Sequence, residues 1–171
     1  VQDGFLFINA GAVDGSYGTA LLIDLEAVCT ESSTDQPFFK AKDFRVIHKS
    51  PRLLAVDCHT ASIQFRLISG HAPSSDASEQ DKNAWYEPYG RLCNTSLHII
   101  ALTDMNAKFE LRANPSLPVS QGSKDNYARF CDHLHQCQLK VPNEAQQWAE
   151  TCTIPAPPRM EGMIVRSIMR N

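Results

Sequence analysis

An aspartate and an asparagine lie two residues apart directly after an apolar run, and this pair could carry chemistry. Residues 97–103 form the run, and Asp104 and Asn106 follow it. Such a run is typical of a strand buried on both faces. Side chains two apart in extended chain point the same way, and a carboxylate and an amide at a strand's carboxyl end suit a metal ion and a phosphate oxygen. Alternatively, both residues are ordinary turn formers.

His71 is the second candidate. It follows the alternating run 63–69, and a nearby glycine and proline predict that the chain leaves the sheet at this point. If the two strands are neighbours, His71, Asp104 and Asn106 converge at one edge of the sheet, where open α/β sheets bind their ligands. The alternative is a loop histidine near an unrelated turn.

A cluster of cysteines and histidines at residues 131–137 suggests zinc at first sight. Residues two apart on a helix differ in direction by roughly 200°, so Cys131 and His135 share one face while His133 lies nearly opposite. One tetrahedral ion could not collect all of these ligands on a regular helix. We therefore expect cysteines that face the core and histidines at the surface.

Length, charge and composition narrow the class of protein. The chain has 171 residues, enough for one domain with a sizeable core, and its formal charge of −3 gives no global attraction to nucleic acid. Its apolar runs are too short to span a bilayer. The six cysteines share no CxxC spacing and indicate reduced thiols in a reducing compartment. No G-x-S-x-G elbow, P-loop or GxGxxG motif is present, which sets those enzyme classes aside.

The first part of the chain predicts strands separated by turn residues. The expected strands are 4–10, 19–24, 44–48, 53–58 and 63–69. The first two would form a hairpin with a long connection, and the other three would be neighbours.

The second part of the chain predicts two helices. From residue 79 the pattern is helical, with Ser78 as N-cap, and Pro88 predicts a kink or an early end just before it. A second helix is expected over roughly 125–139, and a last strand over 163–169. The expected apolar face of the second helix consists of Tyr127, Phe130, Cys131, Leu134 and Cys137. This order of elements suggests a layered α/β or α+β sandwich.

Four segments, taken in order, resemble the endonuclease/exonuclease/phosphatase superfamily with the DNase I-like fold, in particular the endonuclease domains of non-LTR retrotransposons. Residues 44–56 resemble the family's central strand pair. Residues 69–73 (Ser-Gly-His-Ala-Pro) resemble the strand end where the family has Tyr or His before Ala-Pro. Residues 102–107 (Leu-Thr-Asp-Met-Asn-Ala) are similar to its Gly-Asp-Phe-Asn-Ala element, and residues 151–153 (Thr-Cys-Thr) to its late Thr-Trp-Thr.

The resemblance implies a single, partial domain over 1–171, a four-layer β-sandwich flanked by helices that cuts phosphodiester bonds with Mg²⁺ or Mn²⁺. Asp104 would hold the metal ion or polarise the attacking water. Asn106 would donate to the scissile phosphate oxygen or orient that carboxylate, and His71 would contact the phosphate. These roles fit metal-assisted phosphoryl hydrolysis.

The family pattern is incompletely matched. Family members carry an Asn and a metal-binding Glu ahead of the matched region and an Asp-His pair at the end, and the matched positions here include neither. Glu161 lies one place out of register with a family acidic residue. A single carboxylate binds Mg²⁺ weakly, and loss of an activating His costs about 10²–10⁴ in rate. We therefore expect the middle of a nuclease domain, either truncated or decayed, with weakened activity.

Two main functions stay open. The first is a metal-dependent DNA endonuclease of the retroelement type. The second is an inactive remnant that binds nucleic acid or protein, with DNA contacts from Lys108, Arg112, Arg159, Arg166 and Arg170. A phosphatase of the same fold, acting on small phosphorylated or lipid substrates, is a looser third. We expect a monomer without membrane contact that lies inside the cell, with the nucleus as one candidate location.

Overall fold

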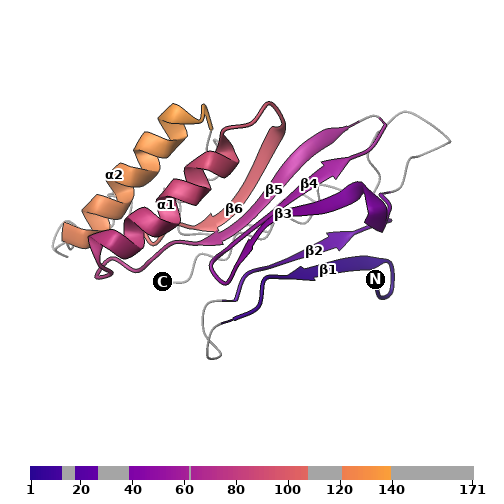
Figure 1. Cartoon of the computed structure of the whole chain (residues 1–171), viewed down its shortest axis with the longest axis horizontal. Coiled ribbons are helices and arrows are strands. Elements are labelled where there is room, and N and C mark those ends of the chain that lie inside the picture. Colours follow the sequence, from indigo (N-terminus) through magenta and orange to yellow (C-terminus); the bar gives the residue numbers. More distant parts are fainter. Residues whose placement is uncertain (13–17, 27–38, 62, 108–120, 140–171) are drawn as a thin grey trace, which may run out of the picture.

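The computed structural model describes residues 1–12, 18–26, 39–61, 63–107 and 121–139. Within these ranges the chain forms a two-stranded sheet, a four-stranded sheet and two α-helices (Figure 1). The elements are β1 (Phe5–Asn9), β2 (Ala20–Asp24), the short 3₁₀ helix η1 (Ala41–Asp43), β3 (Phe44–Ser50), β4 (Leu53–His59), β5 (Gln64–His71), α1 (Glu79–Cys93), β6 (His98–Asp104) and α2 (Gln121–Gln136).

The strands predicted within the described residues are present, and the structure adds their pairing. β1 and β2 form the expected antiparallel hairpin. The larger sheet has the order β3-β4-β5-β6, in which β3, β4 and β5 are antiparallel neighbours and β6 runs parallel to β5. Parallel neighbours need a long crossover, and here α1 lies within it.

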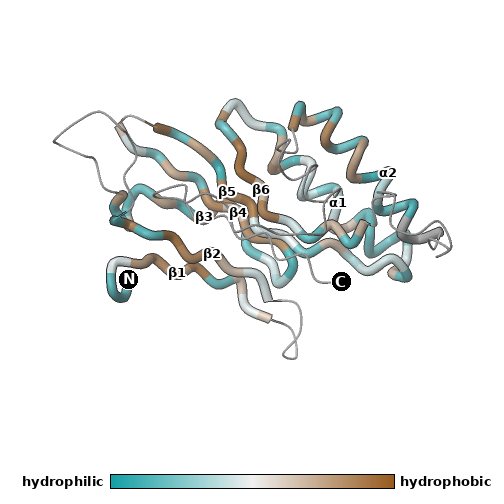
Figure 2. Tube along the Cα trace, turned by 180° about the vertical axis from the view of Figure 1, so that it is seen from behind, coloured by the Kyte–Doolittle hydropathy of each residue, from teal (hydrophilic) through white to brown (hydrophobic). Residues whose placement is uncertain are grey.

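Strand β4 forms the centre of the molecule because both of its faces are buried. Leu53 and Ala55 belong to one apolar cluster with Trp85 of α1, whereas Leu54 and Val56 belong to a second cluster that includes side chains of the β1–β2 hairpin. This alternation is the period of two of extended chain. Figure 2 shows hydrophobic segments in the strands between the helices and the hairpin. The sheet therefore packs on the hairpin with one face and on the helices with the other.

The expected α/β class is confirmed, since a mixed sheet packs against helices. The described residues supply three layers: the hairpin, the four-stranded sheet and the pair α1 and α2 (Figure 1). The fourth layer of the expected sandwich is not among them. None of the helices in the described ranges is long and apolar enough to cross a bilayer.

Two expectations about helix α1 had different outcomes. Ser78 is its N-cap, as predicted, and its side chain accepts a hydrogen bond from the backbone N–H of Asp81. Of the two alternatives predicted at Pro88, a kink or an early end, the early end is wrong, because the helix continues to Cys93. Tyr89 and Cys93, beyond the proline, are buried in the core. Their burial stabilises the last turns despite the one backbone donor that proline lacks.

Strand β6 and helix α2 also differ in detail from the predictions. β6 is half-buried rather than buried on both faces, because it lies at the edge of the sheet among the described strands. α2 begins and ends a few residues earlier than expected. Phe130 of its predicted apolar face is buried, but Tyr127 is exposed. Helical spacing marks a stripe of residues but does not say how far a neighbouring element covers it.

His133, expected at the surface, lies between the two helices. Its ring stacks on Tyr86 with the ring centroids 5.4 Å apart. It packs edge-to-face with Tyr89, with the ring centroids 5.6 Å apart. Its Nδ1 is buried without a hydrogen-bond partner in the described part of the chain. Burial lowers the pKa of His133; Arg129 lowers it further, while Asp132 and the Tyr86 backbone act in the opposite direction.

This environment predicts acid-sensitive stability. A histidine whose pKa is depressed by folding binds more protons in the unfolded chain, so stability falls as pH drops through the ordinary histidine value of about 6.5. We expect the urea midpoint of the wild type to fall more between pH 8 and pH 5 than that of His133→Gln. The pKa of His48 is also lowered by burial and by Arg91, but His48 is present in both proteins. Parallel pH profiles would contradict the prediction.

Several expectations fall on residues outside the described ranges. They are the strand over 163–169, the Thr-Cys-Thr segment 151–153, Glu161, and the proposed DNA contacts Lys108, Arg112, Arg159, Arg166 and Arg170.

Candidate functional site

His71 and Asp104 lie next to each other in the backbone register of the sheet. They are the last residues of β5 and β6, and in the parallel pairing His71 is opposite Asp104. Counting back by twos, they share a face with Leu67 and Leu102, which pack toward the β1–β2 hairpin. The strands that carry His71 and Asp104, whose pairing the sequence left open, are therefore neighbours. His71 belongs to the strand rather than to the loop, and the chain leaves the sheet after it.

Asn106 is close to both strand ends, but not through the alternation that the sequence suggested. Its φ is 47°, in the left-handed region, so Asp104 and Asn106 are not in continuous extended chain. Its backbone N–H donates to Asp104 Oδ1 at 2.9 Å, and its Nδ2 donates to the carbonyl oxygen of Ala72 at 2.7 Å. Asn106 thus holds the Asp104 carboxylate with its backbone and the segment after β5 with its side chain.

The tight packing of these strand ends depends on a glycine. A Cβ at Gly70 would lie 2.8 Å from Thr103 Cγ2 and 3.1 Å from Trp85 Cζ2. The absence of that atom lets β6 and α1 approach β5 directly before His71. The glycine that suggested a break in the sheet instead permits close contact within it.

Arg52 is a residue of the site that the sequence reasoning missed. It lies in the turn between β3 and β4, and its Nη1 donates to the carbonyl oxygen of Ala72 at 3.3 Å, the same oxygen that accepts from Asn106. Its own carbonyl oxygen accepts from the backbone N–H of His71 at 2.9 Å and from Trp85 Nε1 at 3.1 Å. A permanent positive charge therefore lies beside the candidate residues. The available signal was an arginine in a tight turn between two strands.

Asn126 on α2 is a second missed residue. Its side chain is fully buried, and its Nδ2 donates to the carbonyl oxygens of Pro73 and Asn106. It lies four residues before Phe130 and thus on the helix face that packs on the core. A polar residue in that phase of the helical pattern was the available signal.

The number of carboxylate and other metal ligands at the strand ends limits which metal ion the site could hold. In the described part of the chain no group of three or more His, Cys, Asp and Glu side chains could hold a metal ion. Asp104 is exposed and provides a single carboxylate. Mg²⁺ usually binds to one or two carboxylates together with substrate phosphates, so the donor set fits a metal ion shared with a phosphate.

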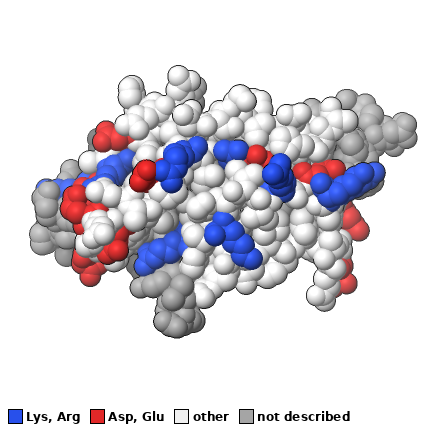
Figure 3. Space-filling view, viewed as in Figure 1, with Lys and Arg blue, Asp and Glu red and all other residues white. Residues whose placement is uncertain are grey.

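Figure 3 shows Lys and Arg side chains across the face seen in Figure 1, with Asp and Glu side chains between them.

Comparisons with known proteins define no class for this chain by sequence, since no protein-family model and no curated protein matches it. Among solved structures the chain is similar to the endonuclease domain of TRAS1, a telomere-specific non-LTR retrotransposon. The two are 13% identical, with a TM-score of 0.48, and the alignment covers 76% of this chain. It covers 52% of that chain, so the present chain spans about half of that structure's length.

Proposed function

We propose that this chain is a phosphodiester hydrolase of the endonuclease type that nicks DNA with Mg²⁺ or Mn²⁺, at a rate limited by its small ligand set. The observation that carries the proposal is the parallel register of β5 and β6, which brings His71 and Asp104 together at one sheet edge. The carboxyl edge of parallel strands is where α/β proteins place their ligands. The sequence resemblance of residues 69–73 and 102–107 to the nuclease family supports the same assignment.

In this proposal each residue has a defined task. Asp104 would hold a metal ion, which when bound would supply Lewis-acid polarisation of a phosphoryl oxygen. His71, beside Asp104, would contact the phosphate. Asn106 would orient the Asp104 carboxylate through its backbone N–H, which bonds Asp104 Oδ1. Its side-chain amide donates one hydrogen bond to Ala72 and keeps a second N–H that would donate to the scissile phosphate oxygen.

The test is nicking of supercoiled plasmid by the purified chain with Mg²⁺, with Mn²⁺ and with EDTA. We expect nicking with either ion and none with EDTA, because in this proposal the cation held by Asp104 supplies the polarisation of the phosphate. We also expect the rate to keep rising with ion concentration into the millimolar range, because one carboxylate binds Mg²⁺ weakly. Nicking that persists in EDTA would contradict the proposal.

A second candidate function is an inactive module that binds DNA without cutting it, and the single carboxylate of the site favours it. Arg52 beside the strand ends could then contact a phosphate of the backbone. Fluorescence anisotropy of a labelled duplex in EDTA separates the two functions. Binding that weakens steeply between roughly 50 and 200 mM salt, without any nicking in Mg²⁺, would support the module. Salt-independent binding would contradict it.

A further inference from the structure

Asn126 joins the two strand ends of the candidate site through one side chain. Its Nδ2 donates to the carbonyl oxygen of Pro73 at 3.0 Å and to that of Asn106 at 3.2 Å. An asparagine amide carries two N–H donors, so these two contacts occupy both. The segment after β5 and the segment after β6 are therefore tied together from α2.

The amide oxygen of Asn126 has a different environment. Oδ1 is buried and has no hydrogen-bond partner in the part of the chain that the structure describes. An unpaired buried acceptor destabilises the folded state. The two donor contacts to the strand ends are what an asparagine provides at this position and an apolar residue would not.

The carbonyl of Asn106 matters because this residue has a left-handed backbone, with a φ of 47°. Asparagine tolerates this conformation better than most residues with a side chain, and contacts with its surroundings hold it here. Three contacts hold it: the backbone N–H to Asp104 Oδ1, the side-chain amide to Ala72, and the carbonyl to Asn126. Because the first contact holds one oxygen of Asp104, the conformation of Asn106 sets where that carboxylate lies.

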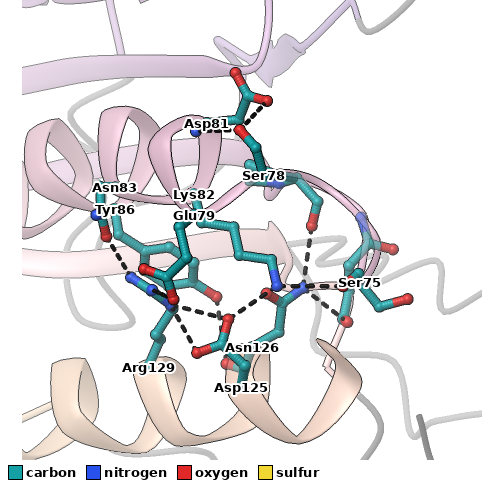
Figure 4. Close-up of polar contacts among 12 residues, drawn as sticks. Ser75, Ser78, Glu79, Asp81, Lys82, Asn83, Tyr86, Asp125, Asn126 and Arg129 are labelled. Atoms are coloured by element: carbon teal, nitrogen blue, oxygen red, sulfur yellow. Dashed lines mark hydrogen bonds and ion pairs between the residues drawn. The ribbon is translucent and has the colours of Figure 1, made fainter. Parts of the chain in front are cut away.

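The start of α2 is itself held firmly, as Figure 4 shows. Lys82 donates to Asp125 Oδ2 at 2.8 Å and to the carbonyl oxygen of Ser75 at 3.2 Å, and Arg129 lies 3.1 Å from Asp125 Oδ1. Burial acts to raise the pKa of Asp125, but the hydrogen bonds from Lys82 and Arg129 outweigh it and the pKa is lowered. Asp125 thus stays charged, and its neighbour Asn126 is fixed against the strand ends.

We propose that Asn126 is a positioning residue, which orients the Asp104 carboxylate by holding the backbone of Asn106. The proposal rests on the proposed function for the reaction that this orientation serves. The hold on the strand ends is a separate claim, and it can be measured without any catalysis.

The experiment compares Asn126→Ala and Asn126→Asp with wild type. The reporter is the buried backbone N–H of Ala72, which donates to the carbonyl oxygen of Asp104 at 2.8 Å and thereby spans the two strand ends. Its protection factor is measured by amide hydrogen exchange in NMR. The matched control is Asn83→Ala, because Asn83 also bonds across α1 and α2, to Arg129 at 2.7 Å, without a contact to the strand ends.

We expect Asn126→Ala to speed exchange at Ala72 by at least about tenfold, because it removes both donor contacts and a single hydrogen bond contributes about that much. Exchange in the β4–β5 ladder should not change, and Asn83→Ala should resemble wild type. In Asn126→Asp a protonated carboxyl can donate one hydrogen bond, but a carboxylate cannot. Protection of Ala72 in this variant should therefore recover at low pH, a response that a residue acting only by its volume would not give.

Activity supplies the second readout. We expect Asn126→Ala to lower the kcat of nicking by about 10²-fold with a nearly unchanged KM for DNA, because misplacing a catalytic group affects the reaction more than binding. Unchanged protection at Ala72, or an equal change in Asn83→Ala, would overturn the positioning role. If wild type does not nick at all, the proposed function fails. The exchange result at Ala72 still shows whether Asn126 holds the two strand ends together. If wild type nicks and Asn126→Ala keeps its full kcat, the positioning role alone fails.

Discussion

Replacing Asp104 with asparagine is expected to lower magnesium-dependent nicking by about 10²–10⁴-fold, and Asp104→Ala at least as much. Asparagine retains an oxygen that can accept from the backbone N–H of Asn106, as Asp104 Oδ1 does now at 2.9 Å. The turn after β6 should therefore survive while the negative charge that would hold the cation is lost. Initial rates of plasmid nicking over a range of Mg²⁺ concentrations measure the effect.

The chain contains a matched control for this substitution. Asp24 ends β2, is exposed, and accepts at Oδ1 from the backbone N–H of Glu26 at 2.9 Å, the same local pattern as Asp104. Asp24→Asn should nick at the wild-type rate. If Asp104→Asn also nicks at the wild-type rate, Asp104 acts only as a turn former, and the metal-assisted mechanism is wrong. Circular dichroism of both variants would show that the fold is retained.

Replacing Asp57 with alanine is expected to lower the free energy of unfolding by about 3–5 kcal/mol. Asp57 on β4 and Arg66 on β5 form a buried, two-pronged ion pair, with Arg66 Nε 2.6 Å from Oδ1 and Nη2 3.0 Å from Oδ2. Arg66 Nη1 also donates to the carbonyl oxygen of Leu92 at 2.7 Å and so fastens the end of α1 to the sheet. Alanine would leave the buried guanidinium without the carboxylate that now pairs with it. Urea unfolding at neutral pH measures the change.

Two further variants show whether the loss of stability in Asp57→Ala comes from the buried ion pair. Glu87→Ala removes the exposed partner of Arg91 on α1 and should change stability by less than about 1 kcal/mol, because exposed ion pairs contribute little. The double variant Asp57→Leu with Arg66→Met should recover much of the stability, since apolar residues of similar volume often replace a buried pair at little cost. A loss below about 1 kcal/mol in Asp57→Ala would mean that solvent screens the pair.

Local features of the sequence were sufficient to predict most of the elements. Apolar runs between turn residues marked the strands, and Ser78 marked the start of α1 because its side chain caps a neighbouring backbone N–H. Such features depend on residues a few places apart in the sequence, which are also neighbours in the folded chain. Predictions that required knowledge of distant packing were less accurate. Helix α1 passes Pro88 because residues beyond it are buried against other elements, and His133 is covered by α1.

For the candidate site too, the sequence indicated which residues to consider but not how they meet. His71, Asp104 and Asn106 could be selected from residue type and from their place after apolar runs. Their meeting depended on the parallel register of β5 and β6, which pairs His71 with Asp104. The sequence alone left that pairing open, because strand alternation is the same whichever neighbour a strand takes.

The sequence by itself thus determined the α/β character of the chain, its strands and the start of α1, because these follow from short-range propensity and side-chain periodicity. Only the tertiary structure decided which polar groups meet. Arg52 reaches Ala72 from another turn, Asn126 reaches Asn106 from α2, and Asp57 meets Arg66 across two strands. Each contact joins elements whose relative placement is set by burial of the two apolar clusters on either side of β4. That placement depends on the summed packing of many distant residues, which no local motif encodes.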